Sequence, residues 1–449
     1  MKRTFFTLFF AIGLSMMLHA QWTSPGDGTT YTMSELVSVT DGTVTYDGNY
    51  HIHADLTIAQ NDVLEIDNGF TKIFVENALI TIQGSMTCIN TNRVSVMGDP
   101  HFKMRFENAT GCEVKKMYFS DGEGIKVIES EVSFIDTKFL YFTRDYSNAV
   151  IDFMNCNPTI EDCYFLLNEG AAISSPANGQ GSPRILNNHI EENVTGDLNS
   201  PQINLGPGSN DTIYIVGNEI DGAYGTHRVG GISVADLLGT GATKVLVKDN
   251  VVKSGRYGYN QQGLTLSSII VGNQFIDNNY EENPMNGGSG ISIYGVDGNN
   301  KAVIRNNLIT GNLWGITLIN AADIDLGTEE DWGNNTIHDN GNEGVVYDLY
   351  NNTACDFMAV GNDWGTSDQH VIEDHIFHKN DNPSLGLITY VPYIGYNETN
   401  EIATGNNPAT VVYYNLHGQP VNKESLKGGV YIEETMNATT RTFKKIIRQ

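Results

Sequence analysis

Through the middle of the chain, apolar and polar positions follow a pattern that returns about once every two dozen residues. The pattern reads apolar-x-x-Asn-x-apolar, so that an Asn separates two short apolar segments. Clear copies centre on Asn188, Asn218, Asn250, Asn273 and Asn307, weaker ones on Asn335 and Asn362, and earlier copies hold Met117, Thr137 and Cys163 in the Asn slot. One unit is too short to bury a face alone, so the units must stack.

A second motif, small-apolar-x-apolar, lies between copies of the first. Its copies begin at Gly124, Gly231, Gly263, Gly290, Gly315 and Gly344, with looser copies at Ala149, Ala172 and Gln202. Apolar residues two apart predict short strands with one buried and one exposed face. Two such strands per unit, joined by turns, predict one coil of a parallel β-solenoid. Asn suits the bend between strands because it tolerates left-handed backbone geometry, so the Asn residues should form an inward ladder.

The paired motifs resemble the repeats of the right-handed parallel β-helix superfamily, which has the pectate-lyase-like fold, over roughly residues 50–365. The segments 50–58, 63–66 and 80–84 are similar to the first coils of such proteins, and 361–394 to their closing segment. The resemblance implies an all-β, single-stranded right-handed parallel β-helix. It also implies a site on the outward face of one sheet and on the long loops beside it.

Both ends of the chain carry other signals. Lys2 and Arg3 precede an apolar run, and a small residue, Ala20, offers a cleavage site, which predicts a signal peptide over residues 1–20. No other apolar run approaches membrane-spanning length. We therefore expect a β-helix with its terminal caps over residues 21–396, a linker over 397–406 and a separate C-terminal domain over 407–449.

The C-terminal domain reverses the charge of the chain. From residue 403 onward there are three acidic and six basic side chains. The strand-like segments 411–421 and 427–432 and the basic finish 443–449 resemble the C-terminal sorting domain of proteins exported by the type IX secretion system. That resemblance implies a small β-sandwich that binds the secretion machinery, and a passenger at the outer-membrane surface or in the medium.

Composition restricts the partners. Lys and Arg total 26 against 53 Asp and Glu, a formal charge of −27, which disfavours nucleic acid and anionic membranes. An acidic polysaccharide would need a local basic patch or bridging Ca²⁺. The five cysteines are an odd number; Cys88 and Cys112 lie about one coil apart and a bridge between them is conceivable, but small buried hydrophobes are the better interpretation.

The outward positions of the second motif form a row of small polar side chains. The predicted row is Lys126, Ile151, Ser174, Asn204, Ser233, Thr265, Ser292, Thr317 and Val346, and the next row adds Tyr294 and Asp348. Hydroxyl and amide groups can hydrogen-bond sugars. The row holds no pair of carboxylates, which glycoside hydrolysis requires. An ordinary sheet face of polar strand-forming residues is the alternative interpretation.

The loops near 190–201, 221–230, 253–262 and 276–289 are predicted to wall one side of that row. They hold the aromatic binding candidates Tyr224, Tyr257, Tyr259 and Tyr280, and the candidate bases of a lyase, His227, Arg228, Lys253 and Arg256. Sequence signatures of pectate lyases, polygalacturonases and alginate or chondroitin lyases are missing. Exposed polar loops are the alternative.

A metal site has two weak candidates. One is a predicted capping helix opened by Ser367, which contains His370, His375 and His378. The other is an acidic turn over 323–331, which has oxygen ligands without a recognised calcium spacing. Ca²⁺ stays open. The favoured function is a secreted or surface module that binds polysaccharide; a polysaccharide lyase or related carbohydrate-active enzyme, and a structural stalk or adhesin, are the alternatives.

Overall fold

The computed structural model describes residues 21–67, 71–196, 198–222, 226–239, 242–283, 286–295, 300–320, 322–342, 345–396, 410–415, 419–423, 426–436 and 441–448. The chain forms two compact units, Met1–Gly395 and Tyr396–Gln449. The predicted signal peptide over 1–20 and the predicted linker over 397–406 lie outside the described residues. In the described part, no helix is long and apolar enough to cross a membrane.

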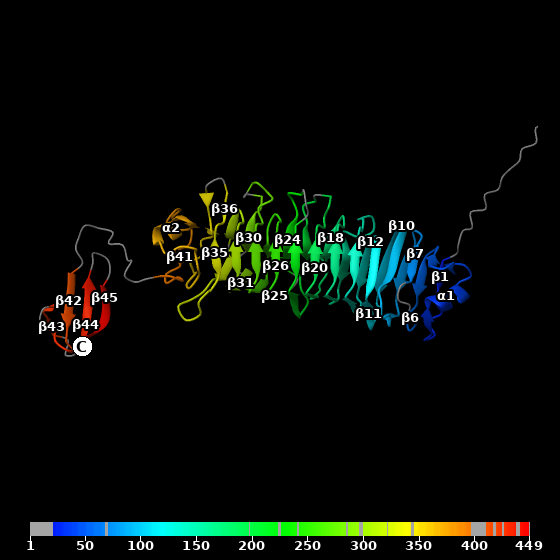
Figure 1. The fold of residues 1–449 in the computed structure, drawn as a ribbon, viewed down its shortest axis with the longest axis horizontal. Helices are drawn as coiled ribbons and strands as arrows, with labels where there is room; N and C mark the ends of the chain where they lie inside the picture. Colours follow the sequence, from blue (N-terminus) through cyan, green and yellow to red (C-terminus); the bar gives the residue numbers. More distant parts are fainter. Residues whose placement is uncertain are drawn as a thin grey trace, which may run out of the picture. The chain divides into compact units, whose positions relative to one another are not determined.

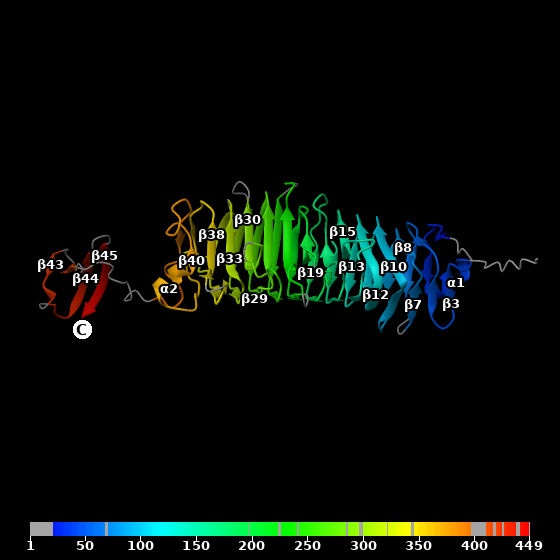
Figure 2. The same cartoon turned by 90° about the horizontal axis from the view of Figure 1, so that it is seen from above.

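The first unit is the expected parallel β-helix, with three strands per coil instead of the two predicted. The Asn motif spans a bend, and its two apolar segments form separate strands on either side. A typical coil therefore contributes one strand to each of three ladders, A, B and C, whose strands pair in parallel except for the antiparallel pair β3–β4. Figures 1 and 2 show the coils stacked in chain order from the blue N-terminal end to the orange end of this unit.

Ladder A contains the second motif. Its strands are β1 (Trp22–Thr23), β5 (Leu56–Ile58), β8 (Leu79–Ile82), β10 (Val94–Glu107), β12 (Met117–Ile128), β15 (Ala149–Met154), β18 (Ala171–Ser174), β21 (Pro201–Leu205), β24 (Gly230–Asp236), β27 (Tyr259–Gly263), β30 (Ser289–Gly295), β33 (Trp314–Ile319), β38 (Leu349–Asn352) and β40 (Ile376–Phe377). The long strands β10 and β12 begin in ladder B and end in ladder A, which joins the two ladders into a 25-stranded sheet.

Ladder B follows the Asn bend. Its other strands are β3 (Val44–Tyr46), β4 (Tyr50–Ile52), β7 (Lys72–Val75), β14 (Lys138–Leu140), β17 (Tyr164–Leu166), β20 (His189–Glu191), β23 (Glu219–Asp221), β26 (Val251–Lys253), β29 (Gln274–Ile276), β32 (Leu308–Thr310) and β35 (Thr336–His338).

Ladder C, a 12-stranded sheet, precedes the Asn bend. Its strands are β2 (Thr30–Thr32), β6 (Val63–Ile66), β9 (Ser85–Cys88), β11 (Cys112–Lys115), β13 (Val132–Ile135), β16 (Thr159–Glu161), β19 (Arg184–Leu186), β22 (Thr212–Val216), β25 (Thr243–Lys248), β28 (Leu266–Val271), β31 (Asn300–Arg305) and β34 (Ala322–Asp325).

The predicted asparagine ladder is confirmed at the bend between ladders C and B. Each side-chain oxygen accepts from the preceding member: Asn218 Nδ2 donates to Asn250 Oδ1 at 2.9 Å, and the backbone N–H of Asn218 donates to the same oxygen at 2.9 Å. The series runs through Asn188, Asn218, Asn250, Asn273, Asn307, Asn335 and Asn362, all at most 2% exposed. Thr137 and Cys163 hold the same slot earlier, as predicted.

A second inner ladder lies at the bend between ladders B and A. Asn278, Asn312 and Asn340 are bonded in series, and the last donates to the buried carboxylate of Asp348 at 2.9 Å. Asp348 therefore points inward, which corrects its predicted place in an outward row. Burial raises the pKa of its carboxyl, although the hydrogen bond from Asn340 and the nearby His375 oppose that shift.

Helices close the ends of the first unit (Figure 1). Helix α1 (Met33–Val39) begins with a capping box between Thr32 and Glu35. Helix α2 (Gln369–Asp374) is capped by Asp368, one residue later than the predicted Ser367, because the Asp368 side chain accepts from the backbone N–H of His370. Short strands complete this unit: β36 (Gly341–Asn342), β37 (Val345–Val346), β39 (Phe357–Met358) and β41 (Ile388–Thr389).

The second unit has one antiparallel sheet of four strands in the order β43-β42-β44-β45. They are β42 (Thr410–Tyr414), β43 (Pro420–Val421), β44 (Gly429–Met436) and β45 (Arg441–Arg448). The strands β42 and β43 overlap the predicted segment 411–421, β44 overlaps 427–432, and the pairing is local in sequence.

Candidate functional site

The outward row of ladder A is continuous and mostly polar. Register pairing places its members directly above one another from coil to coil. The row is Arg105, Lys126, Asp152, Ser174, Asn204, Ser233, Asn260, Ser292, Thr317, Tyr350 and Phe377.

Three predicted members of this row are wrong. Ile151 is completely buried, and its neighbour Asp152 takes the outward position, because a slip of one residue exchanges the two faces of a strand. Asn260 replaces Thr265, which lies in the turn before β28. Tyr350 replaces Val346, because Val346 belongs to the short hairpin β36–β37 outside the ladder.

The part of the row from Asp152 to Tyr350 forms the floor of a groove made of two adjoining hollows. Hollow I has a volume of about 470 Å³, and its lining includes Ser233, Asn260, Ser292, Thr317, Arg256 and Trp314. Hollow II has a volume of about 610 Å³, and its lining includes Arg144, Asn148, Asp152 and Ser174. Asn199, Asn204 and Ala235 line both hollows, which makes the groove continuous along the axis of the coils.

Short hydrogen bonds order the floor of the groove. Asn260 Nδ2 donates to Ser233 Oγ at 3.0 Å, and the hydroxyls of Ser289 and Thr317 lie 2.7 Å apart. In hollow II, Ser174 Oγ donates to Asp152 Oδ1 at 3.0 Å. The polar groups are therefore held by stacked strands of one rigid sheet.

Aromatic rings border hollow I at its C-terminal side. Trp314 stacks on Tyr350 with ring centroids 4.6 Å apart and an angle of 13° between the planes, and Tyr350 stacks on Phe377 at 4.8 Å. Trp314, Tyr350 and Tyr294 all line the hollow. Of these three residues, only Tyr294 was predicted from the sequence. Trp314 lies before the outward position of its motif copy, and Tyr350 takes the position predicted for Val346.

The loop between β26 and β27 supplies a guanidinium and a phenol. Arg256 donates to the Asn199 side chain and to the backbone carbonyl of Asn286, so it links two neighbouring loops along the rim. Tyr257, a predicted binding residue, lines the same hollow. Burial raises the pKa of Tyr257 to about 12, although its hydrogen bond to Ser233 and the charge of Arg256 oppose the shift.

The four candidate bases are not brought together. Lys253 lies on ladder B, where its Nζ contacts Glu219 at 3.1 Å and Asp221 at 3.4 Å. The hydrogen bond to Glu219 raises the pKa of Lys253, which keeps it protonated. His227 donates from Nδ1 to the backbone carbonyl of Tyr280 at 2.8 Å, and both His227 and Arg228 are exposed outside the hollow linings.

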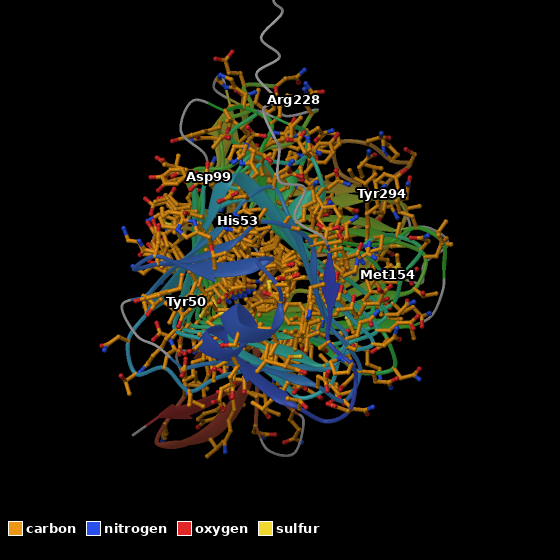
Figure 3. The ribbon with its side chains drawn as sticks, turned by 90° about the vertical axis from the view of Figure 1, so that its right-hand side faces the viewer. Tyr50, His53, Asp99, Met154, Arg228 and Tyr294 are labelled. Atoms are coloured by element: carbon orange, nitrogen blue, oxygen red, sulfur yellow. The ribbon has the colours of Figure 1, made fainter. Side chains whose placement is uncertain are left out.

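Figure 3 shows Arg228 and Tyr294 on different parts of the molecule. Of the four candidate bases, only Arg256 lines the groove. Of the remaining aromatic candidates, Tyr259 is completely buried and so cannot contact a ligand, Tyr280 is exposed outside both linings, and Tyr224 lies outside the described residues.

Asp152 is the functional candidate that the sequence analysis missed. Burial raises the pKa of its carboxyl, while the hydrogen bond from Ser174 and the charge of Lys126 act in the opposite direction. Lys126 occupies the neighbouring position on the preceding strand, and its Nζ lies 4.3 Å from the ring centroid of Tyr146. The missing signal was the register of β15, which the looser motif copy placed one residue too early.

The weak metal candidates have other roles. His378 donates from Nε2 to Glu373 at 3.0 Å and accepts at Nδ1 from the backbone N–H of Ile388, so both ring nitrogens are used within the cap. Arg305 bridges Asp325 and Asp331 of the acidic turn at 2.8 Å and 3.0 Å. Among the residues that the structure describes, no group of three or more His, Cys, Asp or Glu could hold a metal ion, and the five cysteines are free thiols.

Comparisons with known proteins find a family model and solved structures that are similar to the chain. A family model described as a protein of unknown function (DUF1565) matches residues 243–370, and no curated protein matches. The periplasmic alginate epimerase AlgG is similar in structure at 12% identity, covering 81% of this chain and 83% of its own, with a TM-score of 0.41. The receptor-binding tailspike of bacteriophage Det7 is similar at 8% identity, covering 94% and 82%, with a TM-score of 0.34.

Proposed function

We propose that this protein binds a glycan along the groove on ladder A. The observation that supports this proposal most strongly is the continuous outward row of hydroxyl and amide side chains on the floor of two adjoining hollows. Such groups both donate and accept hydrogen bonds, as sugar hydroxyls do. Because stacked strands fix their positions, little side-chain entropy is lost when a ligand binds.

The aromatic border of hollow I supports the same proposal. Trp314 lines the hollow and stacks on Tyr350, which in turn stacks on Phe377. An aromatic ring that is already held in place offers an apolar surface to the apolar face of a sugar at low entropic cost. We expect one sugar ring to contact Trp314 while its hydroxyls bond to Ser292 and Thr317.

We also propose that the protein is exported and acts at the cell surface or in the medium. The predicted signal peptide and the resemblance of the C-terminal segments to a type IX sorting domain support this route, and the described strands of the second unit are compatible with a small separate domain. Cleavage of the second unit on export, followed by mass spectrometry of the released protein, would test the route.

Polysaccharide lyase activity is the second candidate, and Asp152 is the observation that favours it. A carboxyl of raised pKa on the floor of a groove, beside Lys126, is a candidate general base or acid. A stalk without any ligand is the remaining alternative.

A glycan panel separates the three functions. The purified protein is passed over immobilised polysaccharides with Ca²⁺ or with a chelator, and retention is recorded together with ultraviolet absorbance from unsaturated products. Retention without product supports the binding module, rising absorbance supports the lyase, and neither signal on a broad panel supports the stalk.

A further inference from the structure

Each hollow of the groove contains one guanidinium that has no carboxylate partner among the residues that the structure describes. Arg144 lines hollow II and donates to the Asn148 side chain at 3.1 Å; Arg256 lines hollow I and donates to Asn199 and Asn286. Neither forms an ion pair with any described Asp or Glu. The Nε atom of each is enclosed without a hydrogen-bond partner in the described part of the chain. Both guanidinium groups thus retain unused donor capacity.

The charge of these two residues is unusual for this protein. The chain carries a formal charge of −27, and two other cations of ladder A form ion pairs: Lys103 with Glu123 at 3.4 Å and Arg105 with Glu107 at 3.7 Å. Among the described residues, hollow I has no carboxylate in its lining. Hollow II contains Asp152, whose charge is opposed by Lys126 on the adjacent strand. The groove is therefore locally cationic on an acidic protein.

We propose that the ligand of the groove is an acidic glycan, whose carboxylate or sulfate groups are bound by Arg144 in hollow II and by Arg256 in hollow I. This inference rests on the proposed glycan binding and adds the class of ligand. A guanidinium binds carboxylate or sulfate through parallel hydrogen bonds, and such charge-assisted bonds are the stronger kind.

The two guanidinium groups set a minimum length for the ligand. Arg144 precedes β15 and Arg256 precedes β27, and four strand spacings separate these strands in ladder A. At about 4.8 Å per spacing the two sites are roughly 19 Å apart along the groove. An oligosaccharide that is too short to span this distance should contact only one guanidinium, whereas a long chain should contact both.

The test compares glycans that differ only in charge. Polygalacturonate and its methyl ester form one pair, and a sulfated galactan and its desulfated form are the second pair, so that carboxylate and sulfate are separated. The proteins are wild type, Arg144→Gln, Arg256→Gln, the double variant, and Lys244→Gln as a control for an exposed cation on ladder C. Circular dichroism and melting check that each variant is folded, and Arg256→Lys keeps the charge should Arg256→Gln fail to fold.

We expect one charged glycan to bind at least about tenfold more tightly than its neutral partner, and each Arg→Gln variant to lose about tenfold of that affinity. Lys244→Gln should lose less than about twofold, and added salt should weaken binding of the charged form alone. Equal binding of charged and neutral forms, unchanged in both Arg variants, would overturn this inference and leave glycan binding intact. Failure of wild type to bind any glycan would instead contradict the proposed function.

Discussion

The inner asparagine ladder and the outward row of ladder A run through the same coils, yet they are built by opposite rules. The inner ladder repeats one residue type, because every member must accept two hydrogen bonds from one neighbour and donate to the next. The outward row changes from cationic through hydroxyl and amide to aromatic along the axis. Packing fixes the first and leaves the second free, which is why function is to be sought on the outward row.

The largest effect should come from removing an inner member. Asn250→Ala removes the acceptor of the Asn218 backbone N–H, one of the acceptors of Asn218 Nδ2, and the side-chain donor to the backbone carbonyl of Ile215, all in a completely buried site. We expect a loss of about 3 kcal/mol or more in the free energy of unfolding, because each buried group left unpaired costs about 1–3 kcal/mol. Urea denaturation of the purified wild type and variant measures this difference in the free energy of unfolding. A loss below about 1 kcal/mol would show that the ladder contributes little to stability.

The next largest effect should come from a substitution in the aromatic border of hollow I. Trp314→Ala should lower affinity for the bound glycan about tenfold, since it removes the ring on which a sugar would stack. Tyr214→Ala is the control, because Tyr214 is a partly exposed aromatic on ladder C. Titration calorimetry with the best glycan gives both affinities, and equal affinities in the two variants would remove Trp314 from the binding surface.

The C-terminal cap should show a pH effect on stability. The hydrogen bond from His378 lowers the pKa of Glu373 to about 2 from its usual value of 4.5. A lowered pKa stabilises the fold above pH 4.5, and this contribution is lost as the pH falls toward 2. Glu373 is about one-third exposed, so we expect Glu373→Gln to cost about 1–2 kcal/mol at pH 7 after solvent screening.

Melting of Glu373→Gln and wild type at pH 7, 5 and 3 would measure this effect. The difference between the two proteins should shrink steadily below pH 4.5. A difference that stays constant down to pH 3 would mean that the pKa of Glu373 is not lowered by the cap.

The smallest effect on stability should come from the matched substitution on the outward row. Asn260→Ala changes the same residue type only one strand away from Asn250, but Asn260 is partly exposed and loses a single bond to Ser233. We expect the free energy of unfolding to fall by less than about 1 kcal/mol and the glycan affinity to fall a few-fold. If Asn260→Ala destabilised the fold as much as Asn250→Ala, the distinction between inner and outward positions would fail.

Sequence patterns predicted the inner structure better than the site. Asn188 through Asn362 could be found because one residue type recurs at a slot that the bend requires. The outward row depends on register, which a looser motif cannot fix: Ala149 begins its copy one residue too early, and Gly263 ends a strand that the motif supposed it to begin. Asp152 and Asn260 were missed for this reason.

The positions of the loop residues were harder to predict from the sequence than the outward row. The prediction that several loops wall one side of the groove is supported by Asn199, Arg256 and Asn286, which come from three of them. Spacing along the sequence could not show that Lys253 ends on ladder B among carboxylates, or that Tyr259 faces the core. Those outcomes depend on which strand each residue joins, and that is decided by packing between coils.

Filling the groove is the most direct test of glycan binding on the outward row. Ser292→Tyr places a large ring on the floor of hollow I, and Ser267→Tyr places the same ring on the exposed face of ladder C. With the glycan that wild type retains best, calorimetry should show binding abolished or weakened at least about tenfold in Ser292→Tyr and unchanged in Ser267→Tyr. Equal binding by the two folded variants would contradict the proposal that the outward row of ladder A contacts the ligand.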